Sequence, residues 1–135
     1  MKLKALEKRL LKAYNDSFRM SLILSKERYN RFDAYNDMQI AELKVRTDDY
    51  PNTLIEFDKY AYNTRYCQIF GKEFLYIVGT LKGIFVFNIT DLDIDNYDYR
   101  WEWRTMPSQT EFGNGEIMKK MVGYIDWGMS CLEIV

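Results

Sequence analysis

Apolar residues recur at helical spacing at the start of the chain, between charged positions. Residues three and four apart lie on the same side of a helix, so Leu3, Leu6, Leu10 and Ala13 form one apolar stripe. We therefore expect an amphipathic helix that starts at residue 2 and is broken by the polar residues 15–17.

The next stretch of the chain has the pattern of extended strands. Residues 18–24 are compatible with a strand, and two further extended segments cover residues 28–35 and 38–46. Residues 36–37, Asn and Asp, separate these two segments and favour a tight turn. The sequence thus predicts a β-hairpin in this region.

A second helix is predicted after the loop that ends at Pro51. Apolar side chains follow helical spacing within residues 52–70, at Leu54, Phe57, Ala61 and Cys67. Gly71 comes next, and glycine is the residue that most often ends a helix. Residues 74–80 and 83–89 are then rich in β-branched and aromatic residues, which predicts two paired, well-buried strands joined by a short turn.

The last third of the chain begins with an acidic loop at residues 91–98. Large and charged side chains alternate in residues 99–104, which predicts a half-exposed strand. The spacing in residues 116–125 predicts a last helix, with inward side chains at Ile117, Met118 and Met121. The whole order predicts one domain over residues 1–135, of the α/β (α+β) class with a mixed sheet.

Composition limits the chemistry that this chain can perform. It has 47% apolar and 29% charged residues, which is typical of a globular protein, and it has no histidine. Catalytic triads that use histidine are therefore excluded, and Cys67 and Cys131 are too few for a structural zinc site. The sequence shows no signal peptide and no membrane span, so we expect a cytoplasmic protein, in the host cytoplasm if it is viral, with both cysteines reduced and buried.

The charge is unevenly distributed along the chain. Residues 1–46 hold eleven basic and six acidic residues, a net charge of +5, whereas residues 47–135 hold eight and fourteen, a net charge of −6. A basic first third could follow a phosphate backbone. The alternative is a solvated helix face together with charges at strand ends.

The predicted hairpin places two carboxylates on one face of the sheet. With the turn at residues 36–39, the numbers of cross-strand partners add up to about 75, so Asp33 lies opposite Glu42. Alternation along the strand puts Lys44 and Ile40 on the same face as Glu42. The opposite face then carries Ala41, Leu43 and Val45.

This pair of carboxylates needs a neutralising partner. Two carboxylates at about 4 Å repel by roughly 4 kcal/mol at an effective dielectric constant of about 20. Mg²⁺ binds oxygen ligands and keeps several waters, so it would neutralise the pair more completely than Lys44 alone. Such an ion polarises a phosphoryl oxygen and lowers the pKa of a bound water. Lys44 is then placed to orient that water or to stabilise the charge of the transition state.

Glu7 adds a third candidate carboxylate. It lies at the edge of the apolar stripe of the first predicted helix, where an acidic residue is unexpected unless it has a partner. The partner could be the same metal ion. It could equally be an exposed base such as Arg9 or Lys12 on the helix surface.

Asp33 is followed, after eight residues, by Glu42-Leu43-Lys44 and is preceded by Glu7 on the first predicted helix. This arrangement resembles the PD-(D/E)XK nuclease superfamily. In such nucleases the aspartate and the glutamate of the ExK element bind Mg²⁺ or Mn²⁺, often together with the following backbone carbonyl and a glutamate of the first helix. The resemblance thus implies Asp33, Glu42, Leu43 and Glu7 as metal ligands, and Lys44 as the residue that assists the attacking water.

The predicted order of elements over residues 2–89 is also similar to the core of that superfamily. The resemblance implies a restriction-endonuclease-like fold, a mixed central sheet flanked by helices in the order αβββαβ. The rest of the chain would be an extension with a C-terminal strand and helix.

Two further cations are candidate contacts to nucleic acid. Arg46 lies two residues beyond Lys44 on the same strand face, where its guanidinium could bind a phosphate. Lys59 follows Glu56 in the second predicted helix, where related nucleases often place a residue that touches the scissile phosphate or the ExK lysine. A solvent-facing Lys59 paired with Glu56 or Asn63 is the alternative.

Two other motifs favour structural explanations. Residues 91–102 place three aspartates and Glu102 at calcium-loop spacing, but Asn96 replaces the required glycine and a strand precedes the segment, so an acidic solvated loop is favoured. Trp101 and Trp103 share one strand face and could stack on unpaired bases, although packing is the favoured explanation.

Together these features predict a Mg²⁺-dependent endonuclease that hydrolyses DNA phosphodiester bonds. Branched or processed DNA would be its substrate, a phage or mobile element its origin, and a homodimer its active form. The competing hypothesis is a non-enzymatic, phage-type inhibitor that binds a host factor through acidic residues 47–135, which would mimic nucleic acid.

Overall fold

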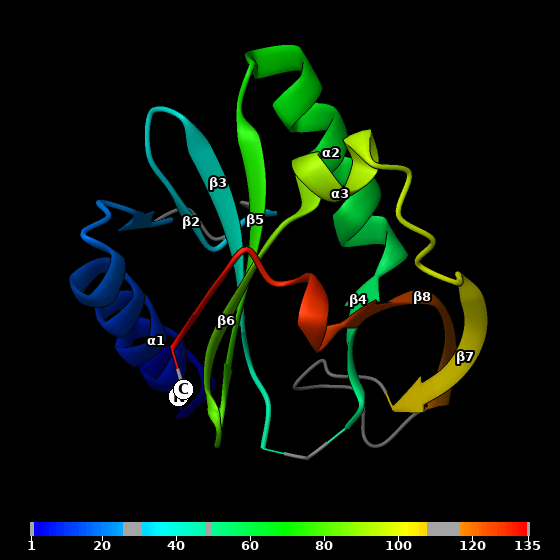
Figure 1. Cartoon of the computed structure of the whole chain (residues 1–135). Coiled ribbons are helices and arrows are strands. Elements are labelled where there is room, and N and C mark those ends of the chain that lie inside the picture. Colours follow the sequence, from blue (N-terminus) through cyan, green and yellow to red (C-terminus); the bar gives the residue numbers. More distant parts are fainter. Residues whose placement is uncertain (1, 26–30, 48–49, 108–116, 135) are drawn as a thin grey trace.

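The structure is a computed structural model that describes residues 2–25, 31–47, 50–107 and 117–134 (Figure 1). This part of the chain forms three α-helices and two β-sheets. The helices are α1 (Lys2–Phe18), α2 (Phe57–Phe70) and α3 (Ile89–Ile94), with the short 3-10 helix η1 (Trp127–Met129). The strands are β1 (Ile23–Leu24), β2 (Ala34–Tyr35), β3 (Gln39–Val45), β4 (Asn52–Glu56), β5 (Glu73–Thr80), β6 (Gly83–Asn88), β7 (Glu102–Pro107), β8 (Ile117–Asp126) and β9 (Leu132–Ile134).

The larger sheet has the strand order β1-β2-β3-β5-β6-β9. β3 and β5 run parallel, and β4 and α2 form the connection between them, whereas all other neighbours in this sheet are antiparallel. The sheet is therefore mixed, which confirms the general α+β class. The restriction-endonuclease-like fold itself stays a prediction.

The β2–β3 hairpin has the predicted register. Ala34 pairs with Ala41, and Tyr35 pairs with Ile40, as expected for a turn in the middle of the segment. Asn36 stabilises this turn, because its side chain accepts two backbone hydrogen bonds of 2.9 and 2.8 Å. Local turn chemistry thus sets which residues of β3 face each side of the sheet.

Side chains of β3 alternate between two apolar clusters, one on each face of the larger sheet. Ala41 and Leu43 belong to the cluster that contains Leu10 of α1. Ile40 belongs to the other cluster, which contains Cys67 of α2. α1 therefore covers one face and α2 lies on the other (Figure 1), and the even-numbered positions of β3 face α2.

The smaller sheet has the antiparallel order β4-β8-β7. The last helix that the sequence predicts over residues 116–125 is wrong: the described part of this range belongs to β8. Strands pair with β8 on both edges, and these contacts between distant segments outweigh the helical spacing of its apolar residues. Ile117 and Met118 are exposed rather than inward, whereas Val122 and Ile125 are buried.

The second predicted helix is shorter than expected. Residues 52–56 form β4, which pairs with β8, so Leu54 is a strand residue. α2 begins at Phe57 and ends at Phe70. The next residue, Gly71, is the C-cap, and its φ of 66° is left-handed, as predicted for a glycine at this position.

Other predicted boundaries move by a few residues. α1 runs on to Phe18, and only residues 23–24 of the predicted strand 18–24 are a strand. The first part of the predicted segment 28–35 lies outside the described residues. β5 and β6 pair in antiparallel fashion, as predicted.

The predicted acidic loop at residues 91–98 is half helical. α3 extends into it, and the Asn88 side chain caps this helix by accepting a hydrogen bond of 3.1 Å from the N–H of Asp91. β7 begins only at Glu102, so Trp101 precedes the strand.

The two cysteines differ in their exposure to solvent. Cys67 is buried, but Cys131 is exposed, so the prediction that both cysteines are buried is wrong for Cys131, which lies between η1 and β9.

Among the residues described, no helix has the length and apolar character needed to cross a membrane.

Candidate active site

Asp33 lies at the end of the β2–β3 pairing, in a geometry that the sequence did not predict in full. The N–H of Asp33 donates to the carbonyl of Ala41 at 2.8 Å, although Ala41 already pairs with Ala34. Two successive residues therefore oppose one, as in a β-bulge. Asp33 thus reaches the edge of β3 instead of lying squarely opposite Glu42.

The Asp33 carboxylate is held at that edge by β3 itself. Its Oδ2 accepts a hydrogen bond of 2.8 Å from the N–H of Leu43. The N–H and C=O of one strand residue point toward the same edge, so the Leu43 carbonyl lies on the side of Asp33. The Asp33 carboxylate and the Leu43 carbonyl are therefore directed to one region.

Glu42 is the buried acid of the site, with a residue exposure of 3%. Burial and, to a smaller extent, the negative charge of Asp33 raise the pKa of its carboxyl group to about 7, against the opposing effects of Lys59 and Lys44. The pKa of Glu42 therefore responds to the charge of Asp33 as well as to its own burial.

Two ammonium groups neutralise Glu42. Lys59 Nζ lies 3.0 Å from Glu42 Oε1, and Lys44 Nζ lies 3.7 Å from the same oxygen. Lys44 is on the same face of β3 as Glu42, as predicted from strand alternation, and burial together with the charge of Lys59 lowers the pKa of its ammonium. Lys59 comes from the first turn of α2, so it enters the site from the helix that covers this face.

Two further charged side chains, Glu56 and Lys120, extend the site beyond Lys59. Its ammonium also lies 3.8 Å from Glu56 Oε2, and Lys120 of β8 donates to Glu56 Oε1 at 2.9 Å. Burial opposes ionisation of Glu56, but the hydrogen bond from Lys120 and the charges of the neighbouring lysines together outweigh it and lower the pKa of this carboxyl. Glu42, Lys59, Glu56 and Lys120 thus form a chain of alternating charges that joins the two sheets.

Sequence reasoning considered Glu56 only as a partner for Lys59, and it missed Lys120 entirely. Lys120 lies in a segment whose spacing predicts a helix, so nothing in the local pattern places it near residues more than sixty positions away. Pairing of β4 with β8 is what brings Lys120 to Glu56.

Arg46 borders the same site, just beyond the end of β3. Its backbone N–H donates to Gly79 O at 2.8 Å, and its Nη2 donates to Leu54 O at 3.3 Å. Leu54 O also accepts a hydrogen bond of 2.8 Å from the buried Tyr76 hydroxyl. A small cavity of about 20 Å³, room for about one water molecule, lies among Glu42, Lys44, Arg46, Lys59 and their neighbours.

Glu7 does not join this site. It belongs to α1, which packs on the face of the larger sheet opposite to Glu42. Within the described ranges, no three carboxylates or thiolates lie close enough together to bind one metal ion. The structure thus brings Glu42, Lys44, Lys59 and Arg46 together around one small cavity, with Asp33 bonded to the backbone of the adjacent Leu43.

Asp93 and Trp101, from the two other motifs, lie in one aromatic cluster. Asp93 Oδ1 accepts hydrogen bonds from the hydroxyls of Tyr60 and Tyr99, at 3.0 and 2.8 Å, so this carboxylate is engaged in an aromatic cluster. Trp101 packs against both tyrosines, with ring centroids 4.9 and 5.1 Å away. Trp103, by contrast, is 67% exposed, so the expectation that both tryptophans are packed is wrong for Trp103.

Comparison with known proteins adds no assignment to this geometry. No protein-family model matches the chain, and no curated protein matches its sequence.

Proposed function

We propose that this protein is a divalent-metal-dependent endonuclease that hydrolyses DNA phosphodiester bonds, with a restriction-endonuclease-like arrangement of its core. The proposal is supported by the connection from β3 through α2 to the parallel strand β5, which places Glu42 and Lys44 under the N-terminal turn of α2. One observation carries it: the Asp33 carboxylate accepts a hydrogen bond from the N–H of Leu43. It therefore lies against residues 42–44, which contribute the Glu42 carboxylate, the Leu43 carbonyl and the Lys44 ammonium.

The donor atoms suit Mg²⁺ or Mn²⁺. Carboxylate and carbonyl oxygens are hard ligands, and Mg²⁺ commonly uses one or two carboxylates and retains several waters. Asp33, Glu42 and the Leu43 carbonyl would hold the ion, and a third carboxylate from Glu7 is not part of this ligand set. The pKa of Glu42 is raised first by burial and then by the negative charge of Asp33, and an ion of charge +2 would favour the ionised carboxylate.

When bound, the ion would polarise the phosphodiester and a water molecule. Lys44 would orient that water and stabilise the negative charge that develops on the phosphoryl oxygens. Lys59 has 34% of its side chain exposed. Its ammonium could therefore leave Glu42 and bind a phosphate of the substrate instead. Arg46, at the end of the same strand, would bind a neighbouring phosphate.

A cleavage assay tests the proposal. Purified protein is incubated with supercoiled, linear, branched and single-stranded DNA in Mg²⁺ or Mn²⁺, and cleavage is followed on gels. We expect metal-dependent products that decrease by about 100-fold or more in Asp33→Asn, Glu42→Gln and Lys44→Met, because each variant removes a ligand or a positioned charge.

Matched controls separate chemistry from folding. Glu133→Gln and Lys12→Met change exposed side chains outside the site, and we expect them to retain full cleavage. Circular dichroism of every variant checks the fold. Cleavage that persists in folded Glu42→Gln and Lys44→Met, or no metal-dependent cleavage of any of these DNA forms, contradicts the proposal.

A further inference from the structure

One larger cavity adjoins the candidate active site, and a second adjoins the first and continues away from the site. A cavity of about 570 Å³ shares Arg46 with the small cavity around Glu42. A second cavity, of about 620 Å³, shares Tyr50, Pro51 and Trp127 with the first. We call the two together the side groove. Each has the volume of a site for a small ligand, and their shared walls give an extended path that leads to Glu42.

Among the described residues, the part of the side groove nearest Glu42 carries basic side chains. Arg46 and Arg104 contribute to its walls, and none of the described residues that line it is acidic. The chain as a whole has 19 basic and 20 acidic residues, so this local excess is not a property of the overall composition. The nearby Glu102 accepts a hydrogen bond from the hydroxyl of Tyr124, which lines the groove. The walls therefore complement an anionic ligand.

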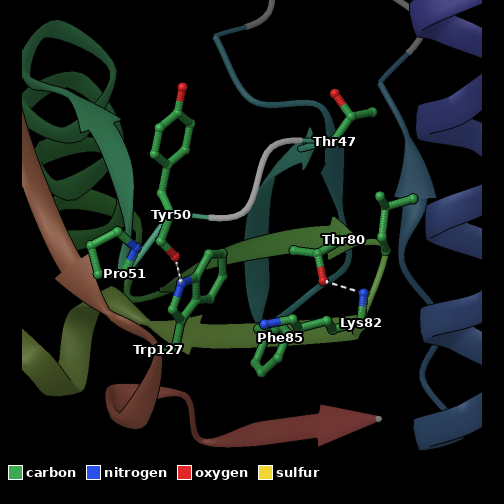
Figure 2. A pocket seen from close by; sticks show the side chains of 8 residues that line it. Thr47, Tyr50, Pro51, Thr80, Lys82, Phe85 and Trp127 are labelled. Carbon is green, nitrogen blue, oxygen red and sulfur yellow. Dashed lines mark hydrogen bonds between the residues drawn. The ribbon is translucent and has the colours of Figure 1, made fainter.

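The side groove also offers aromatic surfaces. Trp127 is only half-buried and packs against Phe85, with ring centroids 4.9 Å apart. Its Nε1 donates to the Tyr50 carbonyl at 2.7 Å, which holds the indole in place. Figure 2 shows this indole beside Pro51 and Phe85, while Lys82 lies farther along at the β5–β6 turn. Aromatic rings next to cations are the combination that binds unpaired bases and their phosphates.

We infer that the side groove binds a single strand of DNA and leads it toward Glu42 and Lys44. Arg46 and Arg104 contact successive phosphates, and Trp127 stacks on a base. A duplex fits this arrangement poorly, because its bases are already stacked and paired and it presents mainly phosphates. The inference deepens the proposed nuclease function and rests on it for the fate of the strand, whereas binding itself requires no cleavage.

Binding is measured by fluorescence anisotropy with a labelled oligonucleotide in chelator, so that no cleavage occurs. The probes are one single-stranded DNA, its duplex and the single-stranded RNA of the same sequence, each over a series of salt concentrations. We expect the single-stranded DNA to bind most tightly. Tighter binding of the duplex or of the RNA, or no binding of the single-stranded DNA at low salt, overturns the inference.

Two variants locate the binding surface. Arg104 is exposed on β7, so Arg104→Glu should fold normally, and we expect it to weaken binding of single-stranded DNA about tenfold or more and to reduce the salt slope by about 0.7 or more. Trp127→Leu removes the stacking surface and should weaken binding by about 5- to 100-fold. The control is Arg9→Glu, the same charge change at an exposed position of α1. Equal losses in Arg9→Glu and Arg104→Glu overturn the assignment of the groove.

The inference and the proposed function can fail separately. Binding that depends on Arg104 and Trp127, without metal-dependent cleavage, supports the side groove and rejects the nuclease. Cleavage that depends on Glu42 but is unchanged in Arg104→Glu and Trp127→Leu, on single-stranded and duplex DNA alike, supports the nuclease and rejects the groove.

Discussion

At the scale of single residues, the Glu42 carboxylate lies between two ammonium groups, Lys59 at 3.0 Å and Lys44 at 3.7 Å. A buried carboxylate loses its hydration, so these cations replace part of what water would supply. Lys59 is the closer of the two and also contacts Glu56. Removal of the Lys59 ammonium leaves the Glu42 and Glu56 carboxylates with less positive charge to neutralise them.

We therefore predict that Lys59→Met lowers the free energy of unfolding by about 1–3 kcal/mol, measured by urea denaturation without metal. Lys12→Met is the matched control, because the Lys12–Asp16 pair is shorter, at 2.8 Å, but its side chains are 79% and 65% exposed. Solvent screens such a pair, so we expect no measurable change in the free energy of unfolding for Lys12→Met. Similar losses in both variants would show that burial of Glu42 does not control the effect.

At the scale of elements, β8 is the strand that joins the smaller sheet to the site. It pairs with β4 and β7, carries Lys120 toward Glu56, and packs against the aromatic segment before β7. Gly123 allows that last contact. A Cβ atom there would lie 2.8 Å from a ring carbon of Trp101 and 2.9 Å from Tyr99 Cβ.

Gly123→Ala is accordingly expected to destabilise the protein by about 1–3 kcal/mol, since the Tyr99 Cβ cannot move without its backbone. Gly128→Ala is the control, because a Cβ at Gly128 would have no atom within 4 Å. Thermal unfolding followed by circular dichroism compares the two variants. An unchanged melting temperature in Gly123→Ala would contradict the close contact between β8 and Trp101.

At the scale of the whole molecule, several tyrosine hydroxyls are withdrawn from water. Burial raises the pKa of Tyr14, Tyr60 and Tyr76 to about 12, from an ordinary value of 10. The folded state thus holds these protons more tightly than the unfolded state. Their contribution to stability is fully present below about pH 10 and is lost as the pH rises through about 12.

We predict that the free energy of unfolding falls as the pH rises above about 10, and that Tyr14→Phe reduces this fall. Tyr14 is the cleanest variant, because its hydroxyl has no hydrogen-bond partner among the described residues and its loss should cost little at neutral pH. Tyr62→Phe, at an exposed position of α2, is the control. Urea denaturation across this pH range gives the comparison, and equal slopes in wild type and Tyr14→Phe would contradict the prediction.

The sequence predicted only in part which of the candidate site residues lie close together. Alternation and turn chemistry are local, so the sequence correctly places Glu42, Lys44 and Ile40 on one face of β3. The bulge at Asp33 was not predicted, because it depends on how β2 ends against β3. Glu7 was assigned to the site from its place beside an apolar stripe, which does not tell which face of the sheet the helix covers.

By itself, the sequence determined the first helix, the hairpin register, the glycine end of α2 and the β5–β6 pair. Each of these depends on residues close together in the chain, whose spacing and turn preferences favour one local conformation. The tertiary structure alone decided that residues 117–126 form a strand, that Lys59 reaches Glu42 and Lys120 reaches Glu56, and that α1 with Glu7 covers the other face. These features depend on contacts between distant segments, where strand pairing and charge compensation outweigh local spacing.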